Sequence, residues 1–394
     1  MPDRALIIDQ SNSYPLQVCR ALARRGCVVD AFAEAAAPVL TSRFCSRRIV
    51  SPPWFETEAF ATLLASTLDA GQYDVVYLCS EVILERTIAP AAGARRWKGL
   101  PLTDPEALTT LFSKNAVMER VAAAGVPVPR TVVPADDAEV ERLAATLPLP
   151  IVVKGEKGEA AQNVRVVRRR DDVVPRYRAI KDRERNYQGR PALQEFIPGT
   201  TYLVGGVFDR GRALRICAQR KAIMFPPGGG ATVKGVTERP PELIASALAA
   251  FAALRYTGIG SLDFIQDARD GRFKFLEINP RVWASIGLGQ RSVDLFGAYR
   301  DLAHGLPPAP DLAYREGLAY HRISGELRVI AREPTRLPGF LKDCLDPRVA
   351  SDFDWTDPRP HLRPGAFTRM LARWTARGAP RSLWDTIVAR AVWR

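Results

Sequence analysis

The chain has 394 residues, of which 47% are hydrophobic and 25% are charged, and its formal net charge is +13. These proportions are typical of a globular protein with two or three domains, and they exclude a disordered or fibrous chain. The positive charge predicts anionic partners. Because the basic residues are spread along the chain and no zinc-finger, RNP or helix-turn-helix signature is present, we expect no nucleic-acid partner.

The N-terminal region lacks the apolar run of a signal peptide, and no apolar stretch is long enough to cross a membrane. We therefore expect a cytoplasmic protein. The six cysteines are scattered without a C-x-x-C pair, and the three histidines are dispersed. This distribution predicts buried free thiols, and it predicts neither a zinc site nor a histidine-based metal site.

Residues 5–100 alternate between strand-like and helix-like segments. Strands are expected at residues 5–8, 27–32 and 73–78, with helices between them. This order predicts a small parallel α/β domain. The turn after the first strand lacks the G-x-G-x-x-G pattern, so we expect no dinucleotide there.

Two lysines occupy distinctive positions in the next part of the chain. Ser113 is the expected N-cap of a helix that begins with Lys114 and ends at Gly125, within the sequence G-V-P-V-P. The apolar strand at residues 150–154 ends in Lys154. Each lysine alone could be an ordinary surface residue. A strand-terminal lysine that faces a cleft nevertheless suits a phosphate group, because it is a point charge on a flexible stem.

The middle of the chain contains an extended segment and a glycine-rich loop. Residues 192–199 read A-L-Q-E-F-I-P-G, which predicts a strand ended by Pro-Gly. A second strand at residues 214–219 leads to Arg220 and Lys221, and then to Pro-Pro-Gly-Gly-Gly within residues 225–234. Consecutive glycines here predict either a mobile lid or a disordered connector.

Two apolar strands then flank a cluster of turn formers at residues 267–271. If the strands pair antiparallel about Asp270, Asp263 lies opposite Glu277, and alternation places Asn279 on the face of Glu277. Two carboxylates and an amide oxygen within an apolar hairpin call for a cation, and an all-oxygen set selects Mg²⁺. The alternative is that both acids are solvated positions on an edge hairpin.

In this order, these segments resemble the ATP-grasp superfamily, which includes biotin carboxylase, carbamoyl phosphate synthase and purine-pathway carboxylate–amine ligases. The resemblance is carried by the two lysines, the extended segment, the glycine-rich loop, and Asp263 with E-x-N-x-R at Glu277 to Arg281. It covers roughly residues 1–305. It implies a mixed α/β and α+β ATP-grasp fold. The implied parts are a Rossmann-like pre-ATP-grasp domain at 1–110, an ATP-grasp domain at 111–305 and a C-terminal extension at 306–394. The ATP-grasp domain is expected to have one lobe at about 111–192 and another at about 193–305.

The resemblance also implies roles for individual residues. The residues implied to bind ATP are Lys114, Lys154, Lys221 and, at the hinge between the lobes, Gln194, Glu195, Phe196 and Ile197. The residues implied to bind Mg²⁺, or Mn²⁺ in its place, are Asp263, Glu277 and Asn279. The residues implied to stabilise a tetrahedral oxyanion are Arg281 and Arg220.

Two segments depart from the family pattern. The loop at residues 155–163, which usually covers the phosphates, is more acidic here. Many members carry a glutamate for the ribose hydroxyls shortly after the hinge glycine, whereas this chain has Thr201 and Tyr202. We therefore expect ribose recognition by Glu195 or by backbone groups.

The implied activity is the ATP-dependent joining of a small-molecule carboxylate to an amine through an acyl phosphate, with release of ADP and phosphate. The alternatives are a small-molecule kinase of the same fold and a non-catalytic nucleotide-binding protein. The substrates are not predicted, and an assembly of two copies is left open. The basic tail at residues 368–394 contains Trp374, Trp384 and Trp393; packing against the core is the preferred interpretation, and contact with an anionic membrane surface is the alternative.

Overall fold

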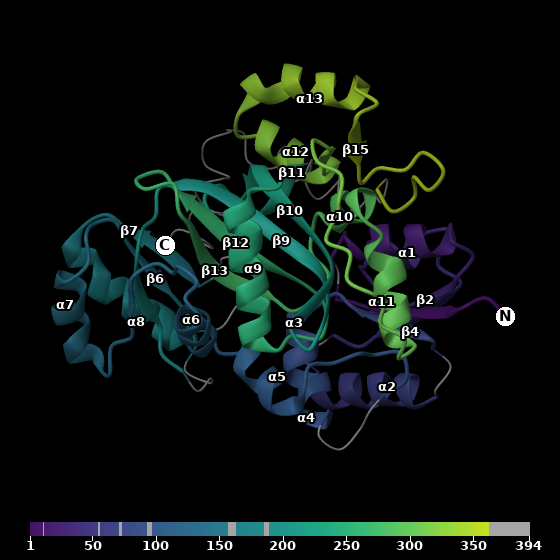
Figure 1. Ribbon diagram of the computed structural model, residues 1–394, viewed down its shortest axis with the longest axis horizontal. Helices are drawn as coiled ribbons and strands as arrows, with labels where there is room; N and C mark the ends of the chain where they lie inside the picture. Colours follow the sequence, from purple (N-terminus) through teal and green to yellow (C-terminus); the bar gives the residue numbers. More distant parts are fainter. Residues whose placement is uncertain are drawn as a thin grey trace, which may run out of the picture.

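The computed structural model of the protein describes residues 1–10, 12–53, 56–70, 73–92, 97–156, 163–184 and 189–361 (Figure 1). The strands in these ranges form three sheets, of four, seven and four strands. Each sheet is covered by helices, and the two four-stranded sheets lie on different sides of the seven-stranded sheet (Figure 1).

The N-terminal sheet is parallel throughout, as predicted. Its strand order is β3-β2-β1-β4, with bounds β1 (Arg4–Ile8), β2 (Val28–Glu34), β3 (Arg47–Ser51) and β4 (Val75–Leu78). The larger helices in this part of the chain are α1 (Pro15–Ala23) and α2 (Thr57–Asp69). The continuous apolar runs of β1 and β4 are explained by burial on both faces of the sheet.

The second four-stranded sheet is antiparallel and has a separate small core. Its order is β5-β8-β6-β7, with bounds β5 (Thr131–Val132), β6 (Ile151–Lys154), β7 (Val164–Val167) and β8 (Ala192–Glu195). The helices α7 (Asp137–Ala145) and α8 (Val173–Arg183) pack against each other, and their apolar side chains share a core with β6. Lys154 ends a central strand, which is the position predicted for it.

The seven-stranded sheet is antiparallel except for its last pair. Its order is β13-β12-β9-β10-β11-β14-β15, with bounds β9 (Gly199–Asp209), β10 (Arg212–Phe225), β11 (Ala231–Thr237), β12 (Gly258–Asp267), β13 (Phe273–Asn279), β14 (Ala319–His321) and β15 (Val349–Ser351). β10 extends well beyond the predicted strand at 214–219. Arg220 and Lys221 therefore lie within a strand, where alternation sends neighbouring side chains to opposite faces.

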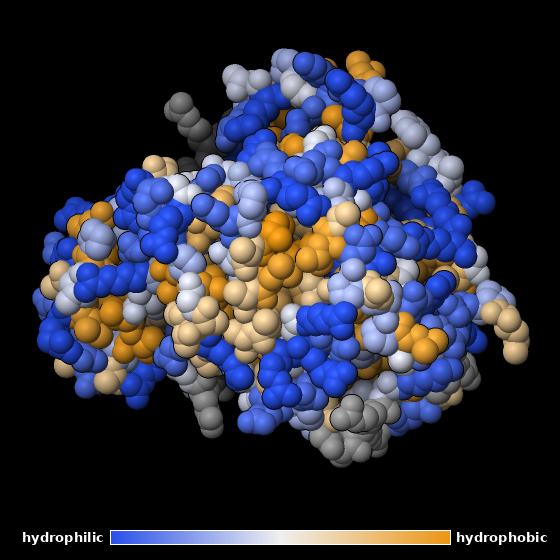
Figure 2. All heavy atoms as spheres, viewed as in Figure 1, coloured by the Kyte–Doolittle hydropathy of each residue, from blue (hydrophilic) through white to orange (hydrophobic). Residues whose placement is uncertain are grey.

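Both faces of the large sheet are buried. On one face, α9 (Pro241–Leu254) packs against Phe208 and Phe264. On the other face, Trp283 and α11 (Leu295–Ala303) share a core with the N-terminal sheet. Figure 2 shows a largely hydrophilic surface on which apolar side chains gather near the centre of the view, around α9.

The segment after α11 is part of the same body. It adds β14 and β15 to the edge of the large sheet, and it carries α12 (Ile323–Ile330) and α13 (Leu337–Leu345) above that edge (Figure 1). Its end returns to the N-terminal domain, where Arg20 of α1 is ion-paired with Asp357. The predicted domain boundaries stay predictions.

The remaining helical elements have ten residues or fewer. They are η1 (Pro38–Thr41), α3 (Glu81–Ile83), η2 (Leu84–Ile88), α4 (Ala89–Ala91), α5 (Pro105–Leu111), α6 (Lys114–Ala123), η3 (Arg170–Asp172), α10 (Ile286–Ser292) and η4 (Pro334–Arg336). Among the described residues, no helix is both long and apolar enough to cross a membrane. All six cysteines are free thiols; four of them are buried as predicted, whereas Cys27 is half-buried and Cys344 is exposed.

Candidate functional site

The hairpin of β12 and β13 brings two carboxylates side by side. Asp263 is paired with Glu277 in the antiparallel register, and Asn279 is paired with Ser261 two residues further along. Because side chains alternate along a strand, Glu277 and Asn279 share a face, and both line the same cavity. The predicted arrangement of facing acids is confirmed.

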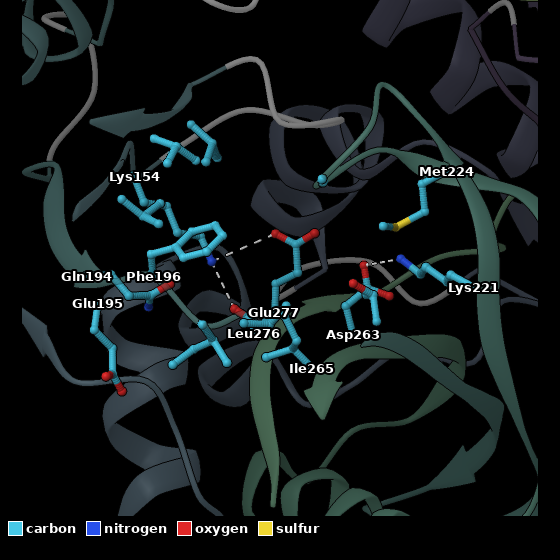
Figure 3. A pocket seen from close by; sticks show the side chains of 17 residues that line it. Lys154, Gln194, Glu195, Phe196, Lys221, Met224, Asp263, Ile265, Leu276 and Glu277 are labelled. Atoms are coloured by element: carbon cyan, nitrogen blue, oxygen red, sulfur yellow. Dashed lines mark hydrogen bonds and ion pairs between the residues drawn. The ribbon is translucent and has the colours of Figure 1, made fainter. Parts of the chain in front are cut away.

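Each of these carboxylates has a lysine beside it (Figure 3). Lys221 on β10 donates a hydrogen bond from Nζ to Asp263 Oδ2 at 2.8 Å. Lys154 Nζ lies 3.9 Å from Glu277 Oε2 and donates to the carbonyl oxygen of Leu276 at 2.8 Å. Since β6 carries Lys154 and β13 carries Glu277, this pair connects the small sheet to the large sheet.

Burial changes the protonation of these groups. It raises the pKa of Asp263, and the nearby charge of Glu277 adds to this effect while Lys221 opposes it. Burial also lowers the pKa of Lys154. For Glu277, burial favours a higher pKa, but Lys154, Lys114 and Lys221 outweigh it, so that the pKa lies below its ordinary value. The effect of burial thus prevails at Asp263, whereas the effect of the neighbouring cations prevails at Glu277.

One oxygen of Asp263 marks where a cation fits. Asp263 Oδ1 is buried and has no hydrogen-bond partner among the described residues. Leaving a buried carboxylate oxygen unpaired is costly, and a cation would remove that cost. Glu277 and Asn279 supply further oxygens from the same face of the hairpin. This all-oxygen set suits Mg²⁺ or Mn²⁺, which keep several positions for water and phosphate oxygens.

The carboxylate pair lies at the end of a cavity that we call the hinge cavity, of about 140 Å³. Gln194, Glu195, Phe196 and Ile197 line its far end, and apolar side chains of both sheets form its walls. The residues that form the walls and the lysine-rich end are Val152, Lys154, Val164, Val166, Thr201, Lys221, Met224, Asp263, Ile265, Leu276 and Glu277. The structure thus places the predicted hinge next to the predicted metal residues.

Glu195 differs from the other hinge residues in where its carboxylate points. Figure 3 shows the carboxylate directed away from Lys154 and Glu277. Its oxygens lie 3.3 Å from Arg269 and 3.5 Å from Lys274, on the turn side of the hairpin. Glu195 is therefore engaged by two cations, and this geometry does not favour its expected use for the ribose hydroxyls.

A second cavity, of about 170 Å³, adjoins the first and shares Lys221, Asp263 and Glu277 with it. We call it the arginine cavity, because Arg281 and Arg322 both line it. The remaining residues of its lining are Asn12, Ser13, Tyr14, Leu203, Gly229, Gly230, Ala231, Thr232, Asn279, Trp283 and Ala284. The two cavities meet at the carboxylates, and the glycine-rich loop between β10 and β11 contributes to both.

The two arginines are held by contacts to opposite sides of the arginine cavity. Arg281 donates from Nη2 to Asn279 Oδ1 at 3.1 Å, and its guanidinium lies over the ring of Tyr14. Arg322 donates from Nη1 to the carbonyl oxygen of Thr232 at 3.2 Å. Guanidinium groups fixed in this way are suited to binding a carboxylate, because they present several donors in a rigid plane.

The structure places Arg220 outside the two cavities. Its Nε donates to Glu238 Oε1 at 2.6 Å, and Tyr202 bonds the other oxygen of Glu238. Since Arg220 precedes Lys221 on β10, its side chain points to the opposite face, and it lines neither of the two cavities. A role in oxyanion stabilisation has no geometric support here.

Lys114 occupies the N-terminus of α6, as predicted. Ser113 is the N-cap, since its hydroxyl accepts a hydrogen bond from the backbone N–H of Ala116 at 3.1 Å. The described lining of neither cavity includes Lys114. Its charge nevertheless lowers the pKa of Glu277, which locates it near the site.

Sequence reasoning missed the residues that complete the arginine cavity. Arg322 belongs to a segment in which no motif was recognised, and no local signal indicates its role. Ser13 and Tyr14 could have been predicted as site residues, because they follow the carboxyl end of a parallel strand, where ligands commonly bind in α/β sheets.

Two predicted features lie outside the described residues. Most of the expected phosphate-covering loop, residues 157–162, is not described, and neither is the basic tail from residue 362 onward.

Comparison with known proteins gives a family for the central part of the chain. Residues 112–285 match the family model of the ATP-grasp domain. Biotin carboxylase 1 of Bacillus subtilis (strain 168) is 21% identical over 265 residues, which cover 61% of this chain and 57% of that protein. The chain thus spans little more than half the length of this relative.

Solved structures agree with that match. Biotin carboxylase from Campylobacter jejuni, in a complex with β-γ-ATP, superposes with a TM-score of 0.65 at 16% identity, covering 80% of this chain and 74% of the other. L-amino acid ligase from Bacillus licheniformis superposes with a TM-score of 0.59 at 19% identity, covering 79% and 76%. At these identities the likeness shows a shared fold, and it confirms the predicted fold class. The chain therefore contains an ATP-grasp domain over residues 112–285.

Proposed function

We propose that this protein is an ATP-dependent ligase that joins a carboxylic acid to an amine through an acyl phosphate. The observation that carries the proposal is the meeting of two different cavities at one pair of carboxylates. The hinge cavity is apolar with lysines at one end, which suits a nucleotide. The arginine cavity has two guanidinium groups, which suit an acid.

In this proposal, the hinge cavity holds ATP with its phosphates toward the lysines. Phe196 and Ile197 contact the adenine, and Lys154 and Lys221 bind phosphate oxygens as point charges. Asp263, Glu277 and Asn279 would hold Mg²⁺, which when bound neutralises negative charge on the transferring phosphate. Because the nucleotide brings its own negative charge, the two lysines would exchange part of their contact with Asp263 and Glu277 for contact with phosphate.

The arginine cavity holds the acid beside the γ-phosphate. The substrate carboxylate attacks the γ-phosphorus, the bond between that phosphorus and the bridging oxygen of ADP breaks, and an acyl phosphate forms. An amine then attacks the acyl carbon, phosphate leaves, and the amine loses a proton. Arg281 and Arg322 orient the carboxylate and stabilise the oxyanion that forms at its carbon. The loop between β10 and β11 excludes water, which would hydrolyse the acyl phosphate.

The comparisons support the class of reaction without naming the substrates. One solved structure of this fold is an L-amino acid ligase and another is a biotin carboxylase bound to a nucleotide. The electropositive character of the arginine cavity agrees with an acidic substrate.

A trapping experiment tests the proposal. The protein is incubated with ATP, Mg²⁺, hydroxylamine and a panel of amino acids, other carboxylic acids and bicarbonate. With the correct acid, we expect its hydroxamate together with equal amounts of ADP and phosphate. A stable phosphorylated product without free phosphate would show a kinase instead. ADP release with bicarbonate alone would place the protein with the carboxylases, and binding of ATP without any turnover across the panel would indicate a non-catalytic nucleotide-binding protein.

A further inference from the structure

Three potential metal ligands meet at the edge of the large sheet, away from the two cavities. His321 ends β14, Glu326 lies in the first turn of α12, and Asp343 lies on α13. One ligand atom from each of the three residues lies within 4.8 Å of the other two. They come from three elements of the segment that follows the ATP-grasp domain, in the upper part of Figure 1.

Two of these side chains are buried, and each has one polar atom without a hydrogen-bond partner among the described residues. The His321 and Glu326 side chains are 1% and 2% exposed, and their nearest atoms, Nδ1 and Oε1, are 4.0 Å apart. That distance is too long for a hydrogen bond. Neither atom has a hydrogen-bond partner among the described residues. Buried polar atoms are nearly always satisfied, so an orphaned pair that faces one point indicates that something is bound between them.

A neighbouring lysine does not fill this role. Lys234 is paired with His321 in the register of β11 and β14, and its Nζ forms an ion pair with Asp343 Oδ2. That contact leaves Glu326 Oε1 and His321 Nδ1 unsatisfied. It also leaves the second oxygen of Asp343 for another cation.

We propose that His321, Glu326 and Asp343 bind a transition-metal dication, for which Zn²⁺ is the best candidate. One imidazole nitrogen with two carboxylate oxygens suits Zn²⁺ better than Mg²⁺, which prefers an all-oxygen shell. Around a tetrahedral Zn²⁺ the ligand atoms lie about 3.3 Å apart, given bond lengths near 2.0–2.1 Å. The observed separations are somewhat longer, so small rotations of the side chains, chiefly of the more exposed Asp343, would close the site.

The location of the metal suggests what it does. His321 precedes Arg322, and alternation sends the two side chains to opposite faces, so that one meets the metal while the other lines the arginine cavity. A metal held by β14, α12 and α13 would fix these elements against β11, directly after the glycine-rich loop. Its role in positioning Arg322 rests on the proposed function, whereas the metal site itself does not.

Metal content tests the site directly. The full-length protein, with its affinity tag removed, is stripped with a chelator and titrated with Zn²⁺ in excess Mg²⁺, with a competing dye as the readout. We expect one Zn²⁺ per chain, and we expect X-ray absorption to show nitrogen and oxygen ligands without sulfur. A sulfur ligand would assign the metal to a cysteine such as Cys344 and overturn the proposal.

Two variants are expected to change the affinity for Zn²⁺ in opposite directions. Glu326→Gln keeps the side-chain volume and should weaken Zn²⁺ binding by at least about tenfold. Lys234→Met should strengthen it, because it removes a competing cation beside Asp343. Glu333→Gln, an exposed residue just after α12, is the matched control and should bind like the wild type.

The outcomes are unambiguous. If Glu326→Gln binds Zn²⁺ as tightly as the wild type, or if Lys234→Met weakens binding, the site is not a metal site and the orphaned pair is bridged by water. Should Glu326→Gln fail to fold, Asp343→Asn on the more exposed α13 replaces it with the same expected loss. None of these measurements uses catalysis, so failure of the ligase proposal would not affect them.

Discussion

The side chains of Glu277 and Lys154 form an ion pair between the large sheet and the small sheet at the site. They lie 3.9 Å apart, and burial favours the neutral form of the lysine. The Glu277 charge counteracts this tendency, because it stabilises the ammonium group that would bind phosphate. Removing the charge while keeping the shape should therefore affect both the metal and the lysine.

We expect Glu277→Gln to lower ATP-dependent turnover by at least about a hundredfold while the fold is retained. The measurement is ADP release at saturating ATP, together with circular dichroism. Glu238→Gln is the matched control, since Glu238 pairs with Arg220 outside both cavities. If the two variants lost turnover to the same extent, Glu277 would have no special role.

A second prediction compares two arginines. Arg322 lines the arginine cavity, whereas Arg220 is engaged with Glu238 on the other face of the sheet. Arg322→Gln should raise the KM for the acid by about tenfold or more and leave the KM for ATP nearly unchanged, since a bidentate contact to a carboxylate is lost. Arg220→Gln should change neither KM. The reverse ranking would restore the role that the sequence suggested for Arg220.

The arginines also show which residues of the site could not be predicted from the sequence. Asp263 and Glu277 were predictable, because a short turn determines which residues of a hairpin face each other. Arg220 and Lys221 are adjacent on β10, and only the three-dimensional pairing with β9 and β11 decides which one faces the site. Arg322 enters the site through pairing of β14 with β11, about 85 residues earlier in the chain. No local pattern encodes such a contact.

At the scale of elements, the loop between β10 and β11 determines access to the site. Gly228 and Gly229 line the hinge cavity, and Gly229 and Gly230 line the arginine cavity. Gly230 is also required by the turn itself, because a Cβ there would lie 2.1 Å from the backbone of Phe225. The loop is thus tightly turned at its base and glycine-rich where it covers both cavities.

We predict that residues 226–232 become ordered when both ATP and the acid are bound. Glycines give the loop little intrinsic rigidity, so contacts with the two ligands should supply it. Hydrogen exchange should show strong protection there with both ligands and weaker protection with ATP alone. The matching reference is the β9–β10 turn at residues 209–212, which lies outside the two cavities. Full protection in the ligand-free protein would show a permanently structured loop.

The elements themselves were largely predictable, and their lengths and partners less so. Ser113 and Gly125 mark the ends of α6 through capping chemistry that is local to the sequence. The three-residue strands β14 and β15 have no such signal, because they are strands only through pairing with β11 and with each other. For the same reason, the predicted C-terminal extension gave no indication that it completes the large sheet.

At the scale of the whole molecule, this segment ties the N-terminal domain to the large sheet. After β15, the chain reaches α1, where Asp357 accepts hydrogen bonds from Arg20 Nε at 2.9 Å and from Ser42 Oγ at 2.6 Å. The backbone N–H of Arg43 donates to its other oxygen at 2.9 Å. The Asp357 side chain is 1% exposed. One buried carboxylate thus joins residues that are more than 300 positions apart in the sequence.

The protonation of Asp357 follows from these contacts. Burial alone would raise its pKa, but the hydrogen bonds from Ser42 and Arg43 and the charge of Arg20 outweigh burial, and the pKa lies below its ordinary value. A carboxylate whose pKa is lowered in the folded state stabilises the fold above its unfolded pKa, which is near 4. This contribution is lost as the pH falls through the lower folded pKa.

We therefore predict that Asp357→Asn destabilises the protein by about 2–4 kcal/mol at pH 7, because it removes the nearer of the two described carboxylates beside the buried Arg20 and leaves only Asp354, whose Oδ2 lies 3.8 Å from Nε. The difference from the wild type should shrink as the pH falls below about 4, because the Asp357 carboxylate then becomes protonated in the unfolded chain and, at its lower folded pKa, in the folded protein as well. Urea unfolding midpoints of both proteins across this range provide the measurement. Asp301→Asn is the control, since it removes an exposed ion pair with Arg300, and exposed pairs contribute little. A loss that is independent of pH would mean that Asp357 acts through shape and not through charge, and the C-terminal segment would then be held to α1 by packing alone.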